Sequence, residues 1–318
     1  MARFVTFTPN PALDVSTSVE RLVDAHKMRC DSPQVHPGGG GINVARVLHR
    51  LGGDVLAIYP CGGPTGERLH ALLHAEGVPD LRLPIAGETR ESLTVHERDG
   101  GREYRFVLPG PALNDAEWDA SLRSLRHSDN PPAWVIASGS LPPGVAVQGH
   151  AQVARVARDM GARMVVDTSG PALAAALQAG VWLVKPSLRE LAELTGHPLE
   201  TTAAQREAAR RLIETGQAQM VALSLGQHGA LLVTATECLQ ARALPVTVTS
   251  SVGAGDSFLG ALVWALDRGE SPAQALASAV AAGAAAVMSA GTALCQPQEV
   301  QALRTQVQVQ VQDCRHLA

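Results

Sequence analysis

The chain has 318 residues, a length that suits one large α/β unit with a small appendage. Hydrophobic residues make up 46% of it and charged residues 18%, so it can bury a sizeable core and wholesale disorder is excluded. Basic and acidic side chains number 26 and 30, and 3% of residues are aromatic, which is not the pattern of a nucleic-acid binder. We therefore expect small-molecule partners, and neither nucleic acid nor a membrane.

Short apolar runs alternate with amphipathic segments along the chain. The strand-like runs are Phe4–Thr8, Val55–Tyr59, Trp134–Ala137, Met164–Asp167, Trp182–Val184 and Met220–Ser224. The segments with a helical pattern include Leu69–Glu76, Val153–Met160 and Ala203–Thr215. This alternation predicts βαβ units and a largely parallel sheet. Residues 275–290 are rich in Ala, Gly and Ser, which indicates a closely packed interior helix and not a membrane span.

Two regions in the first third of the chain break this rhythm. Val15–Val19 with Cys30–Val35, and Leu93–Glu97 with Glu103–Val107, alternate with a period of two, which predicts antiparallel strands. We expect them to form a small lid sheet, contributed by residues 15–36 and 91–108 of a single domain spanning 1–318. A small sheet with one apolar face is marginal in water, so we expect a homodimer through the lid.

Two glycine-rich segments each open a helix. In Pro37–Ala45 four glycines let the backbone approach a ligand closely, although the spacing does not match a dinucleotide fingerprint. In Ser251–Phe258 two glycines and a helix N-terminus predict an anion hole of backbone amides, with Asp256 in the first helical turn. A carboxylate beside such a hole suits phosphoryl transfer, because it can accept a proton from an attacking hydroxyl.

Other kinase signatures are missing, and lysine is rare. The sequence contains no Gly-Lys dipeptide, hence no Walker A loop, and neither His-Arg-Asp nor Asp-Phe-Gly. Only Lys27 and Lys185 are lysines, so each is a candidate for a site that needs a compact ammonium, with chance retention on the surface as the alternative. The five cysteines form no Cys-x-x-Cys pair, which favours a reducing, cytoplasmic location.

The order and separation of these segments resemble the ribokinase-like (pfkB-type) sugar kinase family across nearly the whole chain. The matching stretches are PALD (11–14), PGGGGINVAR (37–46), YRFVLPG (104–110), SGSLPPG (138–144), KPSLREL (185–191), SLGQHGA (224–230) and VGAGDS (252–257). The resemblance implies a three-layer α/β/α fold with a mostly parallel central sheet and a small β-sheet lid. It also implies an ATP-dependent sugar-phosphate kinase that uses Mg²⁺, with K⁺ as a further candidate ion.

The resemblance also implies a role for each matching position. It assigns the sugar phosphate to Asp14, Lys27, Gly38, Gly39, Gly40, Gly41, Asn43, Arg90 and Ser140. It assigns catalysis to Asp256 as the base and to Gly253, Ala254 and Gly255 as the anion hole. It assigns the nucleotide to Lys185, Ser187, Ser224, Gly226 and Gly229, and Mg²⁺, through water, to Glu190. Ser187 departs from the Asn usual in the family, which puts the geometry of the Mg²⁺ shell in doubt. For Arg90 a solvated loop arginine is the alternative.

Three substrates of this family compete, namely fructose 6-phosphate, fructose 1-phosphate and tagatose 6-phosphate. Gly40 stands where kinases acting on the last two carry Lys, which favours fructose 6-phosphate. Asn10, in the pattern Asn-Pro-Ala-Leu-Asp, resembles the 1-phosphofructokinase pattern and favours the opposite choice. We expect phosphorylation of fructose 6-phosphate, with a non-catalytic sugar-phosphate sensor as an alternative of another class. The resemblance further implies inhibition by a second ATP near Lys27, Ser187 and Arg189.

Overall fold

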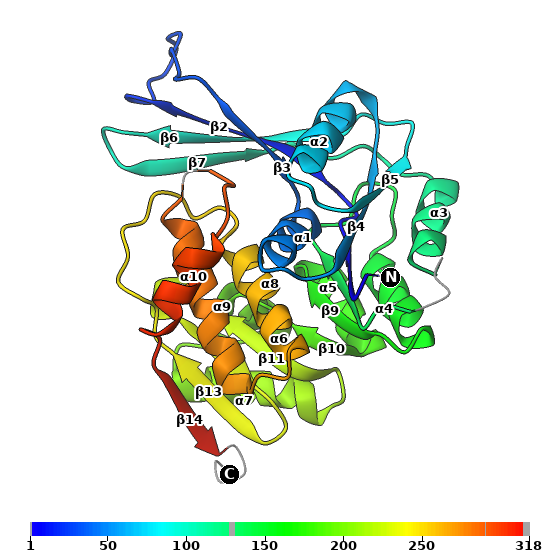
Figure 1. The fold of residues 1–318 in the computed structure, drawn as a ribbon, viewed down its shortest axis with the longest axis vertical. Helices are drawn as coiled ribbons and strands as arrows, with labels where there is room; N and C mark the ends of the chain where they lie inside the picture. Colours follow the sequence, from blue (N-terminus) through cyan, green and yellow to red (C-terminus); the bar gives the residue numbers. More distant parts are fainter. Residues whose placement is uncertain (1, 127–130, 290, 314–318) are drawn as a thin grey trace.

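The computed structural model describes residues 2–126, 131–289 and 291–313 (Figure 1). Within them a ten-stranded sheet has the order β14-β13-β12-β11-β10-β9-β8-β1-β4-β5. Its strands are β1 (Phe4–Phe7), β4 (Val55–Cys61), β5 (Asp80–Pro84), β8 (Trp134–Ser138), β9 (Arg163–Asp167), β10 (Val181–Val184), β11 (Ala218–Ser224), β12 (Ala230–Val233), β13 (Glu237–Ala241) and β14 (Val309–Asp313). The strands from β11 to β5 are parallel, and β12 to β14 are antiparallel additions at one edge.

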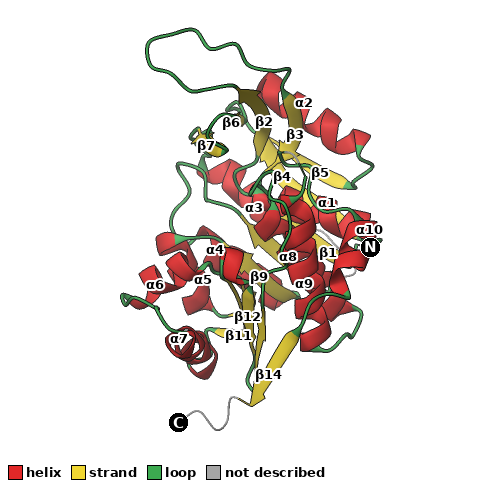
Figure 2. Cartoon of the chain, turned by 90° about the vertical axis from the view of Figure 1, so that its left-hand side faces the viewer, coloured by secondary structure: helices red, strands yellow, loops and turns green. Residues whose placement is uncertain are grey.

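Helices cover both faces of this sheet (Figures 1 and 2). One face packs against α1 (Gly40–Arg50), α2 (Gly63–Ala75), α8 (Ala254–Asp267) and α9 (Pro272–Val287), with α10 (Pro297–Arg304) against α9. The other face packs against α3 (Asp115–Arg126), α4 (Gly149–Asp159), α5 (Gly170–Ala179), α6 (Leu188–Thr195) and α7 (Thr202–Glu214). In β1, Phe4 joins the first layer and Val5 the second, as the alternation of side chains along a strand requires. The predicted three-layer α/β/α class is confirmed.

The predicted interior helix over 275–290 is α9. It begins with Ser271 as N-cap, in a capping box with Gln274, and with Pro272 at its first position. The alanines of its central turns are buried against α8, where their small size lets the two helices approach closely. The helix ends at Val287, and residue 290 lies outside the described part of the chain. Among the described helices, none is both long and apolar enough to cross a membrane.

A second, four-stranded sheet has the order β3-β2-β6-β7 and lies at one end of the molecule (Figure 1). Its strands are β2 (Ala12–Val19), β3 (Gln34–Gly38), β6 (Arg90–Glu97) and β7 (Arg102–Val107). The predicted antiparallel pairs β2–β3 and β6–β7 are present, and a parallel β2–β6 contact joins them. The predicted strand Cys30–Val35 is wrong in its start, because residues 20–33 form a loop, and Pro33, which has no backbone N–H to donate, directly precedes β3. We call this sheet the lid; that residues 1–318 form a single domain stays a prediction.

The two faces of the lid differ in character. Residues opposite each other in paired strands point to the same face, so Val35, Val15, Leu93 and Phe106 form one apolar row across all four strands. Leu93 is 38% exposed and Phe106 is 50% exposed. The opposite face carries polar side chains, among them Asp14 opposite Ser92, and it faces the main sheet. The lid therefore has a polar inner face and an apolar outer face.

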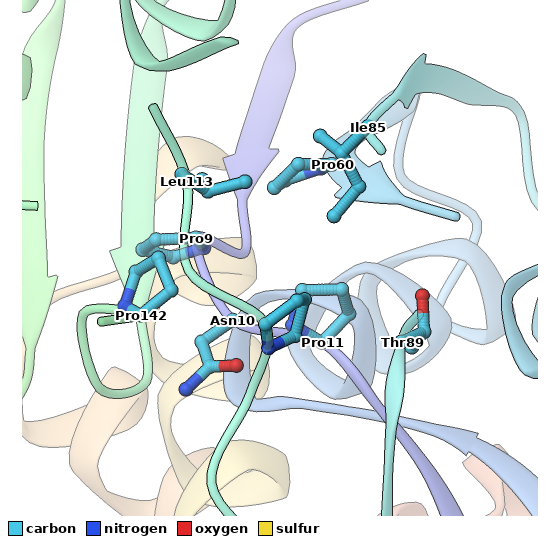
Figure 3. Close-up of a pocket in the computed structure, with 9 residues that line it drawn as sticks. Pro9, Asn10, Pro11, Pro60, Ile85, Thr89, Leu113 and Pro142 are labelled. Carbon is cyan, nitrogen blue, oxygen red and sulfur yellow. The ribbon is translucent and has the colours of Figure 1, made fainter. Parts of the chain in front are cut away.

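Proline-rich segments join the lid to the main sheet. A small void of about 10 Å³ lies among them, and Figure 3 shows the residues that line it. Five prolines are among the residues that line it, namely Pro9, Pro11, Pro60, Pro111 and Pro142. Pro9, Pro11 and Pro111 lie in the segments that join lid strands to the main sheet and its helices, and each fixes one backbone dihedral, which restricts how far the lid can swing.

Candidate active site

A cavity of about 370 Å³ lies between the inner face of the lid and the carboxyl ends of the central strands. From the lid it is lined by Asp14, Arg90, Ser92, Arg105 and Val107. From the main sheet and its helices it is lined by residues that include Gly39, Gly40, Asn43, Ser138, Ser140, Asp167, Glu190, Gly253, Gly255 and Asp256. Ligands of open α/β sheets bind at this end of the strands, so the position alone marks a candidate site.

The glycine run follows the wall of this cavity. A Cβ atom at Gly38 would overlap the Asp14 carboxylate, and one at Gly40 would overlap Ser138 Oγ. Gly39 has a φ of 108°, a conformation that other residues rarely adopt. Larger residues at these positions would displace the side chains that line the cavity.

Asp256 lies in the first turn of α8, directly after Gly253–Gly255, which we call the anion-hole loop and in which Gly253 is the N-cap of the helix. Its Oδ2 accepts a hydrogen bond of 2.8 Å from Asn43 Nδ2 on α1. Burial raises the pKa of the Asp256 carboxyl, while this hydrogen bond and the charge of Lys185 oppose the rise. A buried carboxylate with a raised pKa is a better proton acceptor than one in water, which suits a general base.

Asp14 and Arg90 face the cavity from the lid. Asp14 Oδ2 accepts a hydrogen bond of 3.0 Å from Thr292 Oγ1, and burial raises the pKa of the Asp14 carboxyl. Arg90 donates to the carbonyl oxygens of Asn10 at 3.0 Å and Leu108 at 3.2 Å. Two fixed contacts and a place in the cavity wall show that Arg90 is not a solvated loop arginine.

Lys185 forms an ion pair with Asp167, with 3.1 Å between Nζ and Oδ1. Burial alone would lower the pKa of Lys185, but the carboxylate of Asp167 and its acidic neighbours raise it. Burial raises the pKa of Asp167 to about 6, and the charge of Lys185 opposes this. A Cβ atom at Gly255 would lie 3.5 Å from Lys185 Nζ, so the ammonium lies directly below the anion-hole loop.

Glu190 is held by a capping box at the start of α6. Its Oε2 accepts a hydrogen bond of 2.8 Å from the backbone N–H of Ser187, whose Oγ accepts one of 3.3 Å from the N–H of Glu190. Ser and Asn are both good N-caps, so the departure at Ser187 preserves the helix start.

The Glu190 carboxylate lines the cavity and offers the hard oxygen donors that Mg²⁺ prefers. Among the described residues, no group of three or more His, Cys, Asp or Glu could hold a metal ion. The single Glu190 carboxylate fits the predicted role of holding Mg²⁺ through water, and that role stays a prediction.

Several predicted site residues lie outside the cavity wall. Ser224 forms a bridge with Ser187 at the end of β11, Gly226 begins a 3₁₀ turn, and Gly229 follows that turn. Within the described chain, these four residues adjoin the strand ends without lining the cavity. Gly38 packs against Asp14, while Gly41 and Ala254 are helix residues behind the wall. Lys27 lies in the exposed loop 20–33. The binding roles of these residues stay predictions.

Sequence reasoning missed Arg105, Ser138 and Asp167, which also line the cavity. Arg105 and Ser138 lie inside two of the family-matching stretches, and Asp167 is the last residue of β9. A polar residue at the carboxyl end of a buried parallel strand is the available signal for Asp167. For Arg105 the signal is its alternation with outward-facing Phe106 on a lid strand.

Comparison with known proteins shows that the chain belongs to the pfkB family of carbohydrate kinases, whose model matches residues 12–299. The chain is 46% identical over 299 residues to ATP-dependent 6-phosphofructokinase isozyme 2 of Mycobacterium tuberculosis (strain ATCC 25618 / H37Rv), covering 94% of this chain and 88% of that protein. It is 41% identical over 302 residues to isozyme 2 of Escherichia coli (strain K12), covering 95% and 97%. Its structure matches phosphofructokinase-2 from Escherichia coli in complex with substrates and products, with a TM-score of 0.92, 40% identity and coverage of 96% and 99%.

Proposed function

We propose that the protein transfers the γ-phosphoryl group of ATP to the 1-hydroxyl of fructose 6-phosphate, giving fructose 1,6-bisphosphate and ADP. The observation that carries this proposal is the Asp256 carboxylate, held by Asn43 between the anion-hole loop and the glycine run. The curated relatives at 46% and 41% identity are 6-phosphofructokinases. We also propose that the enzyme is a cytoplasmic homodimer that pairs through the lid.

In the proposed reaction Asp256 accepts the hydroxyl proton as the bond between the sugar oxygen and the γ-phosphorus forms. The bond from that phosphorus to the bridging oxygen of ATP breaks at the same time, and ADP leaves with the electron pair. The backbone amides of Gly253 to Gly255 and the ammonium of Lys185 offset the charge on the phosphate oxygens. Arg90 and Arg105 supply positive charge on the lid side, where the 6-phosphate of the sugar would bind.

Glu190 is the residue that would hold Mg²⁺ through water. The ion, when bound, would neutralise charge on the phosphates of ATP. K⁺ remains a candidate activator, to be tested by replacing it with Na⁺ in the assay.

Gly40 and Asn10 bear on the choice among sugar phosphates. A Cβ atom at Gly40 would overlap Ser138 Oγ, so the lysine that marks the other branch would fit here only if Ser138 moved. Asn10 Nδ2 donates to Ser140 Oγ over 3.2 Å, and Asn10 lies behind the cavity wall, not in it. Of these two residues only Gly40 lines the cavity, and Gly40 favours fructose 6-phosphate.

A substrate panel tests the proposal. Purified protein with Mg-ATP is assayed for ADP release on fructose 6-phosphate, fructose 1-phosphate and tagatose 6-phosphate. We expect the highest kcat/KM on fructose 6-phosphate. A higher kcat/KM on either of the others would move the enzyme to another branch of the family, and binding without ADP release would support the non-catalytic sensor.

A further inference from the structure

Arg46 lies one helical turn after Asn43 on α1, and its side chain is 0% exposed. A buried guanidinium is costly unless it is paired and hydrogen-bonded. Glu76, the C-cap of α2, supplies the pairing charge: Arg46 Nη2 lies 2.7 Å from Oε1, and Arg46 Nε donates to Oε2 over 2.9 Å. The ion pair leaves the other terminal nitrogen, Nη1, facing the active site.

Arg46 Nη1 donates to Asn43 Oδ1 over 3.2 Å. A guanidinium can only donate, so the atom of the Asn43 amide that faces it must be the oxygen. The amide nitrogen then faces the other way, and it is this nitrogen that donates to Asp256 Oδ2 over 2.8 Å. The orientation of the Asn43 amide is thus set from behind the site.

Arg46 Nη1 has two further acceptors, which belong to other parts of the site. One is the carbonyl oxygen of Pro37, at 3.1 Å, directly before the glycine run. The other is the carbonyl oxygen of Thr292, at 3.1 Å, whose side chain donates to Asp14. One buried guanidinium therefore contacts the segments that place the glycine run, Asp14 and the partner of Asp256.

We propose that Arg46 is a positioning residue for phosphoryl transfer, which fixes the Asn43 amide in the orientation that donates to the Asp256 carboxylate. The proposal rests on the proposed function, since it matters only if Asp256 is the base.

The charged groups around Asp256 and Arg46 decide which substitution of Arg46 gives an interpretable result. Asp256 is also influenced by Lys185, directly after β10, by Asp14 from β2 and by Arg105 from β7. Arg46 is influenced by Glu76 from α2, by Arg50 one turn further along α1 and by Asp14, and its own charge acts on His36 of β3. Removing the charge of Arg46 alone would disturb all of these, so the test must conserve net charge.

Arg46→Lys keeps the charge beside Glu76, but a single ammonium cannot reach Asn43, Pro37 and Thr292 together. We expect kcat to fall about 10–100-fold, the usual scale for a misplaced catalytic group, with KM for ATP changed less than about threefold. Without the donation from Asn43 the pKa of Asp256 rises, so the acid limb of the kcat profile moves to higher pH. We expect Asn43→Ala to give the same shift, and Arg46→Lys to add little in the Asn43→Ala background.

The matched control is Arg50→Lys. Arg50 lies on the same helix and also pairs with Glu76, at 3.1 Å, but its other contacts are the carbonyl oxygens of Ala293 and Cys295. We expect a similar loss of thermal stability with kcat and the acid limb unchanged. If Arg46→Lys does not fold, Arg46→Met with Glu76→Gln removes both charges of this pair and conserves net charge. Arg50 then loses Glu76 as well, but its side chain is 20% exposed and keeps its contacts with the carbonyl oxygens of Ala293 and Cys295. This double variant should show the same loss of kcat and the same shift.

A lowered melting temperature with an unshifted acid limb, or fully additive effects of Arg46→Lys and Asn43→Ala, would overturn the positioning role. Asp256→Asn in the same assays separates this from the proposed function. If Asp256→Asn keeps a tenth of the wild-type kcat, the assignment of the base fails and the role of Arg46 fails with it. If it abolishes turnover while both Arg46 variants behave like wild type, only the role of Arg46 fails.

Discussion

At Asp256 two influences oppose each other: burial raises the pKa of the carboxyl, and the hydrogen bond from Asn43 with the charge of Lys185 lowers it. The net direction is a pKa raised above that of a carboxyl in water, in a base that lies beside the amides of the anion-hole loop. A carboxylate on the surface would be too weak a base to help before the phosphoryl bond forms. These opposing influences on the pKa of Asp256 fit a proton transfer late in the reaction.

Asp256→Asn changes the proton acceptor and little else, because the amide has nearly the shape of the carboxylate. We expect kcat to fall about 10²–10⁴-fold, the typical contribution of a general base, with KM for both substrates within a few-fold of wild type. Steady-state kinetics with both substrates varied measure this. A variant with a tenth of the wild-type kcat would remove Asp256 from the proposed mechanism.

His150 on α4 supports the other side of the cavity. Its buried Nε2 lies 3.0 Å from the carbonyl oxygen of Gly139, next to Ser140 in the cavity wall. Burial lowers the pKa of His150 from 6.5 to about 4. As pH falls below 6.5, His150 binds a proton in the unfolded chain but not in the folded chain. Stability is therefore lost between about pH 6.5 and pH 4.

His150→Gln can keep a donor to Gly139 and does not titrate. Between pH 7 and pH 5 we expect wild type to lose about 2 kcal/mol more of its free energy of unfolding than the variant does. Urea unfolding at the two pH values measures the difference. Equal losses in the two proteins would show that His150 does not carry this pH dependence.

At the scale of elements, strand β7 of the lid is tied to the loop that leads into the anion hole. The Glu103 carboxylate accepts hydrogen bonds from Ser250 Oγ at 2.7 Å and Ser251 Oγ at 3.0 Å. Two residues further on, Gly253 begins the anion-hole loop as the N-cap of α8. The lid and the catalytic loop therefore hold each other in place.

Glu103→Ala removes both hydrogen bonds. Because hydrogen bonds to charged groups contribute about 1.5–3 kcal/mol each and the freed serines regain water, we expect KM for fructose 6-phosphate to rise roughly 5–30-fold. Glu91→Ala, which removes an exposed carboxylate from the other face of the lid, is the matched control and should leave KM unchanged. An unchanged KM in Glu103→Ala would show that this contact does not hold the lid over the sugar phosphate.

The elements that the sequence predicts well are those with strong local patterns. The parallel strands follow from apolar runs, and the anion-hole loop follows from glycines before a helix. The predicted start of this lid strand at Cys30 was wrong, because the alternating pattern of Cys30–Val35 extends back into residues that form a loop, and β3 begins at Gln34. The contacts that complete the site are not local: Asn43 and Asp256 are 213 residues apart. Packing alone brings them together, so spacing along the chain could not reveal their hydrogen bond.

At the scale of the whole molecule, the apolar outer face of the lid is covered only in part within the described chain: Val35 packs against the main core, whereas Leu93 and Phe106 stay exposed. Leu93 and Phe106 lie side by side in register, and both are more than a third exposed. A row of aliphatic and aromatic side chains across four strands is the kind of patch that marks a protein interface. The inner face of the same sheet lines the active-site cavity, so a partner on the outer face would also stiffen the wall of the site.

We expect the native chain to sediment as a dimer at micromolar concentration, and Leu93→Glu with Phe106→Glu to give a monomer, because burying two carboxylates in an apolar interface is prohibitive. The control is Val311→Glu, which places the same charge on an exposed valine of the edge strand β14, far from the lid, and should leave the dimer intact. If lid pairing also fixes the cavity wall, the monomeric variant should show a raised KM for fructose 6-phosphate. A native chain that is monomeric and fully active at micromolar concentration would contradict pairing through the lid, and a dimer that survives both lid substitutions would place the interface elsewhere.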